Sequence, residues 1–216
     1  MSLARIKSSL AAESMNDSDF PRAVDPEFFV ELMASKDEDT RRHCSRVATL
    51  AWQLAVEATR SVSYASAVKR TAMVHDVGKL GIPAAILCKP GPLTEREFAV
   101  VRQHPEIGCE LLRGARVGTA CLHSVLCHHE RWDGAGYPNR VAGPNIPTTA
   151  RIIAIADAYD AMVSDRVYRA PRAHGQALEE ISRCAATQFD PSLAATFCQM
   201  DFELQPESPL ERTSAA

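Results

Sequence analysis

Apolar positions recur at helical spacing along most of the chain from Pro26 onward. His43, Val47, Leu50 and Leu54 are spaced i, i+4, i+7 and i+11, which places them on one face of a helix. A later segment has the same period at Ile152, Ile153, Ala156, Tyr159, Asp160 and Val163. Long stretches of alternating apolar and polar residues, which would indicate strands, are missing. The pattern therefore predicts an all-α, single-domain helical bundle.

Local signals mark several helix ends. Thr94 and Glu97 have the spacing of a capping box, which predicts a helix that begins there and runs through His104 to about Leu112. Asp190 and Pro191 are typical of the N-cap and first position of a last short helix.

One long segment, residues 133–147, cannot be helical. Glycine and proline recur through it, so we expect a loop that could include a short hairpin. Loops of this length in a compact domain are usually functional. The residues that indicate the loop are Gly134, Gly136, Pro138, Gly143, Pro144 and Pro147.

The two ends of the chain differ from its middle. Residues 1–25 are polar and lack a period, which predicts a flexible arm or linker, and residues 201–216 are acidic and are expected to be a disordered tail. Residues 26–200 would form the domain. The charges are −5 over residues 1–39, +5 over 40–200 and −3 over 201–216, for a net charge of −3. A mildly basic body would attract an anionic substrate, but the excess is too small for a dedicated binder of nucleic acid polymers.

Cysteine usage and the N-terminal sequence suggest a reducing compartment. The seven cysteines form no Cys-x-x-Cys pair and their number is odd, which argues against a disulfide framework or a zinc finger. The start of the chain becomes acidic where a signal peptide would be apolar, and no stretch is apolar enough to span a membrane. We therefore expect a cytoplasmic protein that does not associate with membranes.

Histidine and aspartate residues supply the chemistry. His75-Asp76 and His128-His129 are adjacent pairs, and His43, His104 and Asp157 lie on other helical segments. Taken singly, each residue is more often a structural residue than a ligand. Together they could be aimed into the centre of a bundle and hold more than one metal ion. Mixed imidazole and carboxylate ligands favour iron or manganese, and zinc, nickel and magnesium stay open.

Lys79 adds a positive charge to this pool. It lies four residues after His75 and three after Asp76, so the three side chains point to one side of a helical turn. A carboxylate can bridge two ions, and an ammonium beside it can bind a phosphate that the ions hold. The expected reaction is in-line attack of a metal-bridging hydroxide on a phosphodiester. Gly136 lacks a Cβ atom, which would let the loop backbone approach the ligand closely.

These residues, in this order, resemble the HD-GYP domains, a bacterial branch of the HD metal-dependent phosphohydrolases. The resemblance covers about residues 30–200. The motifs that carry it are Asp37-x-x-Thr40-x-x-His43-x-x-Arg46-Val47, His75-Asp76-x-Gly-Lys79, Lys89-Pro-Gly-x-Leu-Thr94, His104-Pro105-x-x-Gly108, His128-His129-Glu-Arg-Trp-Asp-Gly-Ala-Gly136-Tyr137-Pro138, Asp157-Ala-Tyr-Asp160-Ala-Met, Arg166-x-Tyr-Arg169 and Phe189-Asp-Pro191.

The resemblance implies an HD-type helical bundle that hydrolyses cyclic di-GMP to the linear dinucleotide pGpG, and often on to GMP. It implies metal ligation by His43, His75, Asp76, His104, His128, His129 and Asp157, with Asp76 bridging two ions. Catalysis would involve Asp76, Lys79 and Asp160. Substrate would be bound by Lys79, Arg166 and Arg169 and by the loop residues Gly136, Tyr137 and Pro138.

Two further expectations come from the same resemblance. Some relatives have a glutamate that binds an extra metal four residues before the first histidine, where this chain has Asp39, so the number of ions is two or three. Residues 132–138 correspond to a surface on which some relatives meet diguanylate cyclase (GGDEF) domains.

Arg166 and Arg169 also fit a phosphate-binding role on chemical grounds. A helix that carries Asp157 and ends near Ser164 would deliver two guanidinium groups just beyond its end. The planar fork of arginine can bind phosphate oxygens in a bidentate manner. The alternative is that these arginines lie on the surface and pair with Asp160 and Asp165.

Two other functions stay open. The chain could hydrolyse another nucleotide, such as a different cyclic dinucleotide or a nucleoside triphosphate, or it could be a non-catalytic receptor or partner-binding module. A complete set of metal ligands argues against the second, because a receptor does not need them.

Overall fold

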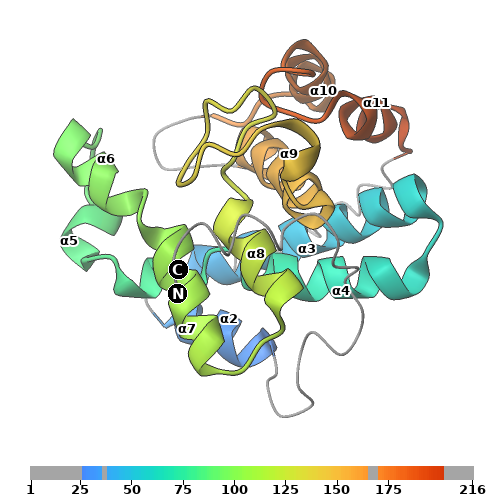
Figure 1. The fold of residues 1–216 in the computed structure, drawn as a ribbon. Helices are drawn as coiled ribbons and strands as arrows, with labels where there is room; N and C mark the ends of the chain where they lie inside the picture. Colours follow the sequence, from blue (N-terminus) through green and yellow to red (C-terminus); the bar gives the residue numbers. More distant parts are fainter. Residues whose placement is uncertain (1–25, 36–37, 165–169, 202–216) are drawn as a thin grey trace, which may run out of the picture.

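The structure, a computed structural model, describes residues 26–35, 38–164 and 170–201. These residues form α-helices, two short 3-10 helices and connecting turns (Figure 1), and within them the only β-type pairing is one isolated bridge between Ala185 and Phe189. The all-α prediction is confirmed. In chain order the helices are α2 (Pro26–Ala34), α3 (Glu38–Thr59), α4 (Val62–Met73), η2 (Val77–Gly81), α5 (Ala84–Leu87), α6 (Glu95–Val101), α7 (His104–Gly114), α8 (Thr119–Cys127), η3 (Gly143–Asn145), α9 (Thr148–Val163), α10 (His174–Arg183) and α11 (Pro191–Gln199).

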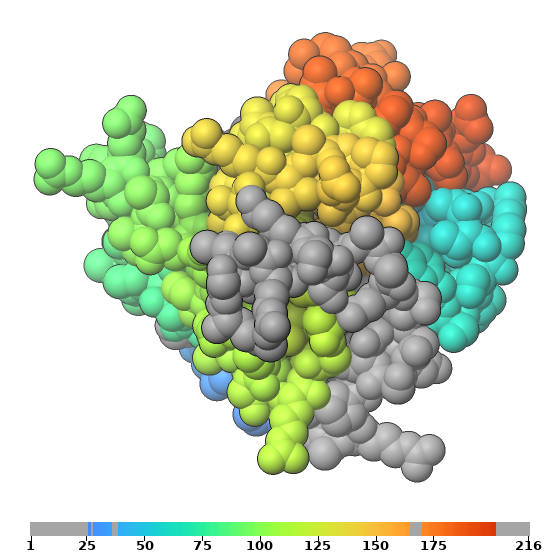
Figure 2. Space-filling view, in the orientation of Figure 1, coloured from blue at the N-terminus to red at the C-terminus, as the bar shows by residue number. Residues whose placement is uncertain are grey.

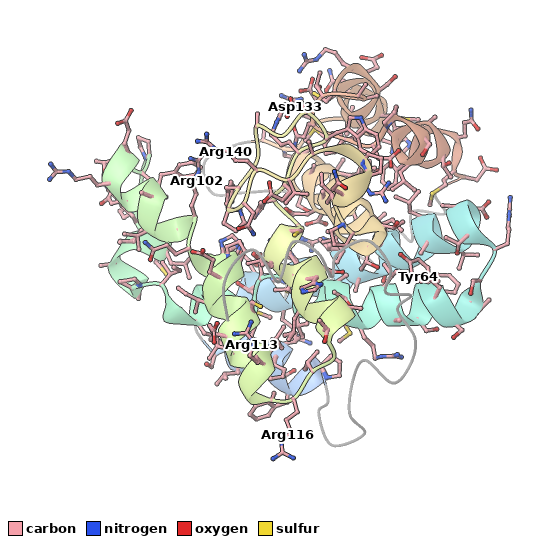
Figure 3. The ribbon with its side chains drawn as sticks, in the orientation of Figure 1. Tyr64, Arg102, Arg113, Arg116, Asp133 and Arg140 are labelled. Atoms are coloured by element: carbon pink, nitrogen blue, oxygen red, sulfur yellow. The ribbon has the colours of Figure 1, made fainter. Side chains whose placement is uncertain are left out.

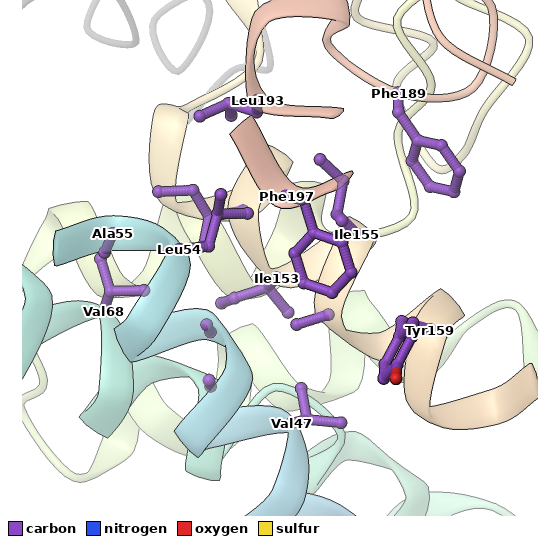
Figure 4. Packing of buried hydrophobic residues seen from close by; sticks show 14 of the residues in the cluster. Val47, Leu54, Ala55, Val68, Ile153, Ile155, Tyr159, Phe189, Leu193 and Phe197 are labelled. Carbon is purple, nitrogen blue, oxygen red and sulfur yellow. The ribbon is translucent and has the colours of Figure 1, made fainter. Parts of the chain in front are cut away.

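The larger of two main apolar clusters joins α3, α4 and α9 to the C-terminal helices α10 and α11 (Figure 4). Val47 and Leu54 from the predicted face of α3 are fully buried in it, together with Ile153 and Tyr159 of α9 and Phe197 of α11. Burial of each such side chain contributes roughly 1.5–3 kcal/mol. This cluster fixes α9 against α3, the two helices that carry Asp157 and His43.

The second cluster joins α2, α4, α7 and α8. Val74 and Val77 on either side of the His75-Asp76 pair are buried here, as are Leu112 of α7 and Val125 of α8. Cys44, Cys109 and Cys121 pack in the same cluster as small apolar side chains, and all seven cysteines are free thiols. The His75-Asp76 pair is therefore held on both sides by buried neighbours.

The helix predicted from the Thr94 capping box is wrong in its extent. The capping box itself is present, with the Thr94 hydroxyl accepting from the Glu97 amide and the Glu97 carboxylate accepting from the Thr94 amide. The helix ends at Val101, however, and a new helix, α7, begins at His104. Pro105 lacks an amide hydrogen and is tolerated only in a first helical turn, which accounts for the break.

The other predicted helix ends agree with the structure. Asp190 is the N-cap of α11 and accepts from the amides of Ser192 and Leu193. α9 ends at Val163 with Ser164 as its C-cap.

The predicted loop crosses the face shown in Figure 2, where it and α9 lie between α5–α6 and the C-terminal helices. Residues 133–147 contain the short helix η3 and no hairpin, because their backbone groups bond elsewhere. The amides of Trp132 and Asp133 donate to the carbonyls of Gln188 and Thr187, at 3.1 and 2.8 Å. The buried carboxylate of Glu130 accepts from the amides of Asn139 and Val141. The loop is thus anchored at its start and near its middle.

Other expectations lie outside the described residues. Residues 1–25 and all but the first residue of the tail 201–216 are not described, so the arm and the tail stay predictions. Among the described helices, none is both long and apolar enough to cross a membrane.

Candidate metal centre

Seven predicted ligands, drawn from five separate segments, come together at one place. Their side chains form two groups in which one ligand atom from each residue lies within 4.8 Å of the others. The first group is Asp76, His104, His128 and His129, and the second is His43, His75 and Asp157.

Asp76 stands between the two groups, and its two carboxylate oxygens face different ones. Oδ1 lies 3.3 Å from His104 Nε2 and 4.0 Å from His128 Nε2. Oδ2 lies 3.4 Å from His75 Nε2 and 3.8 Å from His43 Nε2. A carboxylate in this position can bind one ion through each oxygen. The arrangement fits a pair of metal ions bridged by Asp76.

Three of the histidines are oriented in the same way by the ends of three helices. Nδ1 of His75, His104 and His128 lies 2.6–2.8 Å from the backbone carbonyl three residues earlier, in the last turn of the helix that precedes it. A neutral imidazole that donates from Nδ1 keeps a lone pair on Nε2. The Nε2 atoms therefore face the cluster as acceptors, which is the form that binds a metal.

The electrostatics of the cluster favour the neutral form of three of its histidines. Burial lowers the pKa of His104, of His128 and of His129, the last to about 4, and neighbouring histidines lower them further. Burial also opposes the charge of Asp76, but Lys79 and the surrounding imidazoles hold the pKa of this carboxyl well below its usual value. Neutral imidazoles around an ionised carboxylate are the protonation states that metal binding requires.

Lys79 contacts the carboxylate of Asp76. Its ammonium donates a hydrogen bond to Asp76 Oδ2, as the three-residue spacing predicts. Burial disfavours the charge of Lys79, but Asp76 raises the pKa of the ammonium above its usual value. The ammonium is therefore charged at neutral pH. The side chain of Lys79 is about a third exposed, so solvent can reach it.

The ring of His43 is oriented by a carboxylate, whereas the rings of the three histidines above are oriented by backbone carbonyls. Its Nδ1 donates to Asp160 Oδ2 at 2.8 Å, and Arg46 donates to both oxygens of Asp160, at 2.6 and 3.2 Å. Asp160 is buried and points at His43, so a role in positioning that ring fits the geometry better than contact with a substrate. Arg46 lies three residues after His43 on α3, and this spacing is the one sequence signal for it.

The cluster is closed on one side and open on the other. Asp76, His75, His104 and His128 are buried, whereas the side chains of His43 and Asp157 are 13% and 23% exposed. His129 is also partly exposed. The cluster is therefore exposed on the side of His43, His129 and Asp157.

Two glycines allow the helices to close around the cluster. A Cβ atom on Gly78 would lie 1.8 Å from the His104 carbonyl oxygen and 2.6 Å from the Gly108 amide. Gly108 is one turn after His104 and presents its backbone to Gly78. Only glycine at position 78 lets η2 pack against the start of α7, and this contact brings Asp76 next to His104.

Gly136 has a different role from the one expected. A Cβ atom there would lie 2.4 Å from the Arg131 amide nitrogen and 2.6 Å from the His129 carbonyl oxygen. The space is filled by the chain itself, so glycine serves the tight folding of the loop. The next residue, Tyr137, lies 4.9 Å from His129 between ring centroids, at 27° between the ring planes. The loop thus reaches the cluster through Tyr137, and the Tyr137–Pro138 peptide is cis.

The remaining predicted residues are not in the cluster. Asp39 has an exposed side chain that accepts from Arg42 at 2.8 Å, and it belongs to neither ligand group. A third ion at Asp39 stays a prediction. Arg166 and Arg169 lie outside the described residues, and their predicted contacts with phosphate stay predictions.

The donor set fits divalent metal ions. His75 Nε2 is a buried ring nitrogen without a hydrogen-bond partner in the described part of the chain, and it faces Asp76. Such an atom is costly unless something binds it. Imidazole and carboxylate ligands without cysteine suit iron or manganese.

Comparison with known proteins identifies the family. The HD domain profile matches residues 27–193. A cyclic di-GMP phosphodiesterase of Thermotoga maritima is 37% identical over 175 residues, which is 80% of this chain and 48% of that protein. A 3'3'-cGAMP-specific phosphodiesterase of Vibrio cholerae is 38% identical over 161 residues, covering 74% of this chain and 31% of that protein. The chain thus spans half the length, or less, of these relatives.

Solved structures show the same fold at low sequence identity. A cyclic GMP-AMP specific phosphodiesterase of Vibrio cholerae superposes with a TM-score of 0.59 at 17% identity, over 80% of this chain and 47% of that one. An HD-GYP-type protein of Bdellovibrio bacteriovorus gives 0.59 at 14% identity, over 89% of this chain and 69% of that one. With the profile match and the motifs described above, these likenesses show that the chain belongs to the HD domain family, in its HD-GYP branch.

Proposed function

We propose that this chain is a metal-dependent phosphodiesterase that hydrolyses cyclic di-GMP. The observation that carries the proposal is the position of Asp76, whose two oxygens face two separate groups of ligands. Two bound divalent ions would activate water and neutralise the charge that develops on the phosphoryl oxygens. One ion would be held by His104, His128 and His129, and the other by His43, His75 and Asp157. Asp76 would bind both ions.

The residues of the chain would supply binding and orientation. Lys79 lies beside Asp76 with its charge retained, so it can bind a phosphate oxygen that enters from the open side. Tyr137 covers His129 on that side and narrows the entrance. Arg166 and Arg169 would bind the phosphates from the segment that follows α9.

Cyclic di-GMP is proposed because relatives that match most of this chain are named for it. Other relatives are named for 3'3'-cGAMP, and the family contains both kinds. We propose iron or manganese as the metal from the mixed ligand set. The linear dinucleotide would be the first product, and GMP would follow if the enzyme also accepts it. We also propose that residues 132–138 associate with a diguanylate cyclase domain. The proposed location of the protein is the cytoplasm.

Turnover of a nucleotide panel by metal-analysed protein tests this function. The protein, loaded separately with Mn²⁺, Fe²⁺ and Zn²⁺, would be incubated with cyclic di-GMP, 3'3'-cGAMP and cyclic di-AMP, and products separated by chromatography. We expect pGpG to appear first from cyclic di-GMP, and Asp76→Asn to abolish it. The matched control is Arg113→Ala, a substitution on the exposed side of α7.

Two outcomes would contradict the proposal. Tight binding of cyclic di-GMP without turnover in any metal form would indicate a receptor. Turnover of another nucleotide alone would indicate the other phosphohydrolase function.

A further inference from the structure

We propose that Arg102 recognises a guanine base of the substrate and thereby determines which cyclic dinucleotide this chain accepts. The inference rests on the proposed function, because it assigns a specificity residue to the same site. Arg102 follows α6 and precedes His104 by two residues, so it stands directly beside the cluster in sequence. Neither its spacing nor its residue type indicates this role from the sequence.

The guanidinium of Arg102 is held by aromatic rings. Its Cζ atom lies 5.0 Å from the centroid of the Tyr137 ring and 4.7 Å from the centroid of the Phe98 ring. Tyr137 in turn is stacked on His129, a member of the first ligand group. A continuous series of contacts therefore leads from the cluster through Tyr137 to Arg102.

The position of Arg102 suits contact with a ligand. Its side chain is exposed, and Figure 3 shows it on the side of α6 and α7 that faces the loop. Within the described ranges, no carboxylate lies within ion-pair distance of it, whereas Arg113 and Arg131 are paired with Glu110 and Asp133. Packing on rings fixes the plane of the guanidinium but leaves its N–H groups able to donate at the edge.

A guanine base is the partner that this donor geometry matches. Guanine presents two acceptors, O6 and N7, on its Hoogsteen edge, and arginine binds both at once. Adenine presents N7 as an acceptor but N6 as a donor. One of the two N–H groups of the guanidinium would therefore face another donor. The bases of a cyclic dinucleotide are unpaired, which leaves this edge accessible. Arg102 lies two contacts away from His129, a partly exposed member of the cluster.

A general attraction of charge would give a different result. A phosphate contact would affect every cyclic dinucleotide equally and would be partly restored by lysine, because lysine keeps the charge. A guanine contact depends on the base. The experiment therefore varies both the side chain and a single atom of the base.

The test combines a substitution at Arg102 with a change of one atom in the base, in the manner of a double-mutant cycle. The quantity measured is kcat/KM of metal-loaded protein. Wild type, Arg102→Ala and Arg102→Lys would each be given cyclic di-GMP and its 7-deazaguanine analogue, in which a C–H group replaces N7. We expect Arg102→Ala to lower kcat/KM for cyclic di-GMP by roughly fivefold to a hundredfold. The analogue should be poorer for wild type but no poorer than cyclic di-GMP for Arg102→Ala, because the contact is already lost. Arg102→Lys should retain part of the preference for cyclic di-GMP over the analogue, because an ammonium can also donate to O6 and N7 of guanine.

Arg113→Ala is the matched control, since Arg113 is also an exposed arginine near this sequence region and lies at the other end of α7 (Figure 3). It should match wild type on both substrates. Metal content and thermal stability would be measured for each variant. A variant that keeps both but loses activity has lost recognition of the substrate and not the metal site.

Three outcomes decide the inference. Equal losses on cyclic di-GMP and its analogue would overturn it in favour of a phosphate contact. Wild-type efficiency in Arg102→Ala would overturn it outright. Absence of turnover in wild type would refute the proposed function instead, and calorimetric affinities of the same proteins for the same two ligands would then decide on Arg102.

Discussion

His43 and Asp160 are joined by a hydrogen bond of 2.8 Å from imidazole Nδ1 to carboxylate Oδ2, across 117 positions of sequence. Arg46 binds the same carboxylate, so the buried Asp160 links a partly exposed guanidinium to a candidate metal ligand. Burial lowers the pKa of His43, but the bond with Asp160 and the nearby carboxylates raise it above its usual value. The bond also fixes the ring, so that Nε2 faces Asp76 and Asp157.

Arg46→Ala should weaken metal binding without unfolding the protein. Loss of the groups that orient a ligand typically costs tenfold to a hundredfold in metal affinity. We expect a loss of about that size for the ion held by His43, His75 and Asp157, with the other ion little changed. Titration of metal-free protein against a competing chelator measures it. If each ion binds Arg46→Ala with the same affinity as it binds wild type, Arg46 serves only to neutralise Asp160.

Asp76→Asn should abolish hydrolysis and lower the occupancy of both ions, because each carboxylate oxygen faces one ligand group. Asp157→Asn removes a ligand from one group alone and should lower the metal content by about one ion per chain. Elemental analysis together with circular dichroism distinguishes the two. The bridging role would be wrong if Asp76→Asn, still helical, lost no more metal than Asp157→Asn.

Asp39 tests the number of ions. Its exposed carboxylate is paired with Arg42 and lies outside both ligand groups. If it nevertheless contributes a ligand, Asp39→Ala should lower the stoichiometry by about one and Asp39→Glu should retain it. Identical metal content in wild type and both variants would assign Asp39 to the helix surface.

Asp190→Ala should destabilise the fold and its active-site loop. Asp190 caps α11 and pairs with Arg151, which also donates to the Ile146 carbonyl in the loop. Loss of the cap and of the buried pair should cost roughly 2–4 kcal/mol of unfolding free energy at pH 7. Burial opposes the charge of Asp190, but Ser192 and Arg151 lower its pKa below the usual value.

The pH dependence of this effect has a definite sign. Stabilisation by Asp190 is fully present above the unfolded pKa of about 3.9 and is lost as the pH falls through the lower folded pKa. Denaturant unfolding of wild type and Asp190→Ala at pH 7 and at pH 3 should therefore show a smaller difference at pH 3. A difference that stays constant would mean that packing, and not charge, is the cause.

Arg166→Ala should lower kcat/KM roughly tenfold to a hundredfold, because one charged hydrogen bond to phosphate is worth roughly 1.5–3 kcal/mol. Metal content should not change, and lysine should restore activity only partly. The same holds for Arg169→Ala. Wild-type efficiency of both variants at subsaturating substrate would place these arginines on the surface.

Much of the site could be predicted because its ligands are chemically distinctive. Histidine and aspartate in adjacent pairs or on helical faces indicate a cluster, and the structure brings the seven together. The three-residue spacing predicted that Asp76 and Lys79 point to the same side, and their contact agrees with it, since such a turn needs no partner from elsewhere in the chain.

The rest depends on contacts between distant segments. Nothing near Arg46 in sequence indicates Asp160 as its partner, and Arg102 is placed by a ring 35 positions later. The break between α6 and α7 is different, because its signal, Pro105, is local and the period of apolar residues continues across it. Gly136 has no Cβ for a reason that only the folded loop reveals: the Arg131 amide occupies the space.

The three bonds from histidine Nδ1 to carbonyls at the ends of α4, α6 and α8 orient three candidate ligands without a bound ion. Each imidazole is immobilised when its helix forms, so the entropy cost of fixing these rings, on the order of 1 kcal/mol for each side chain, is incurred during folding. An arriving ion then finds rigid donors and needs little reorganisation of the protein. The metal affinity of the cluster is in this way coupled to the fraying of three helix ends, and a substitution that loosens one of those last turns would release metal without touching a ligand.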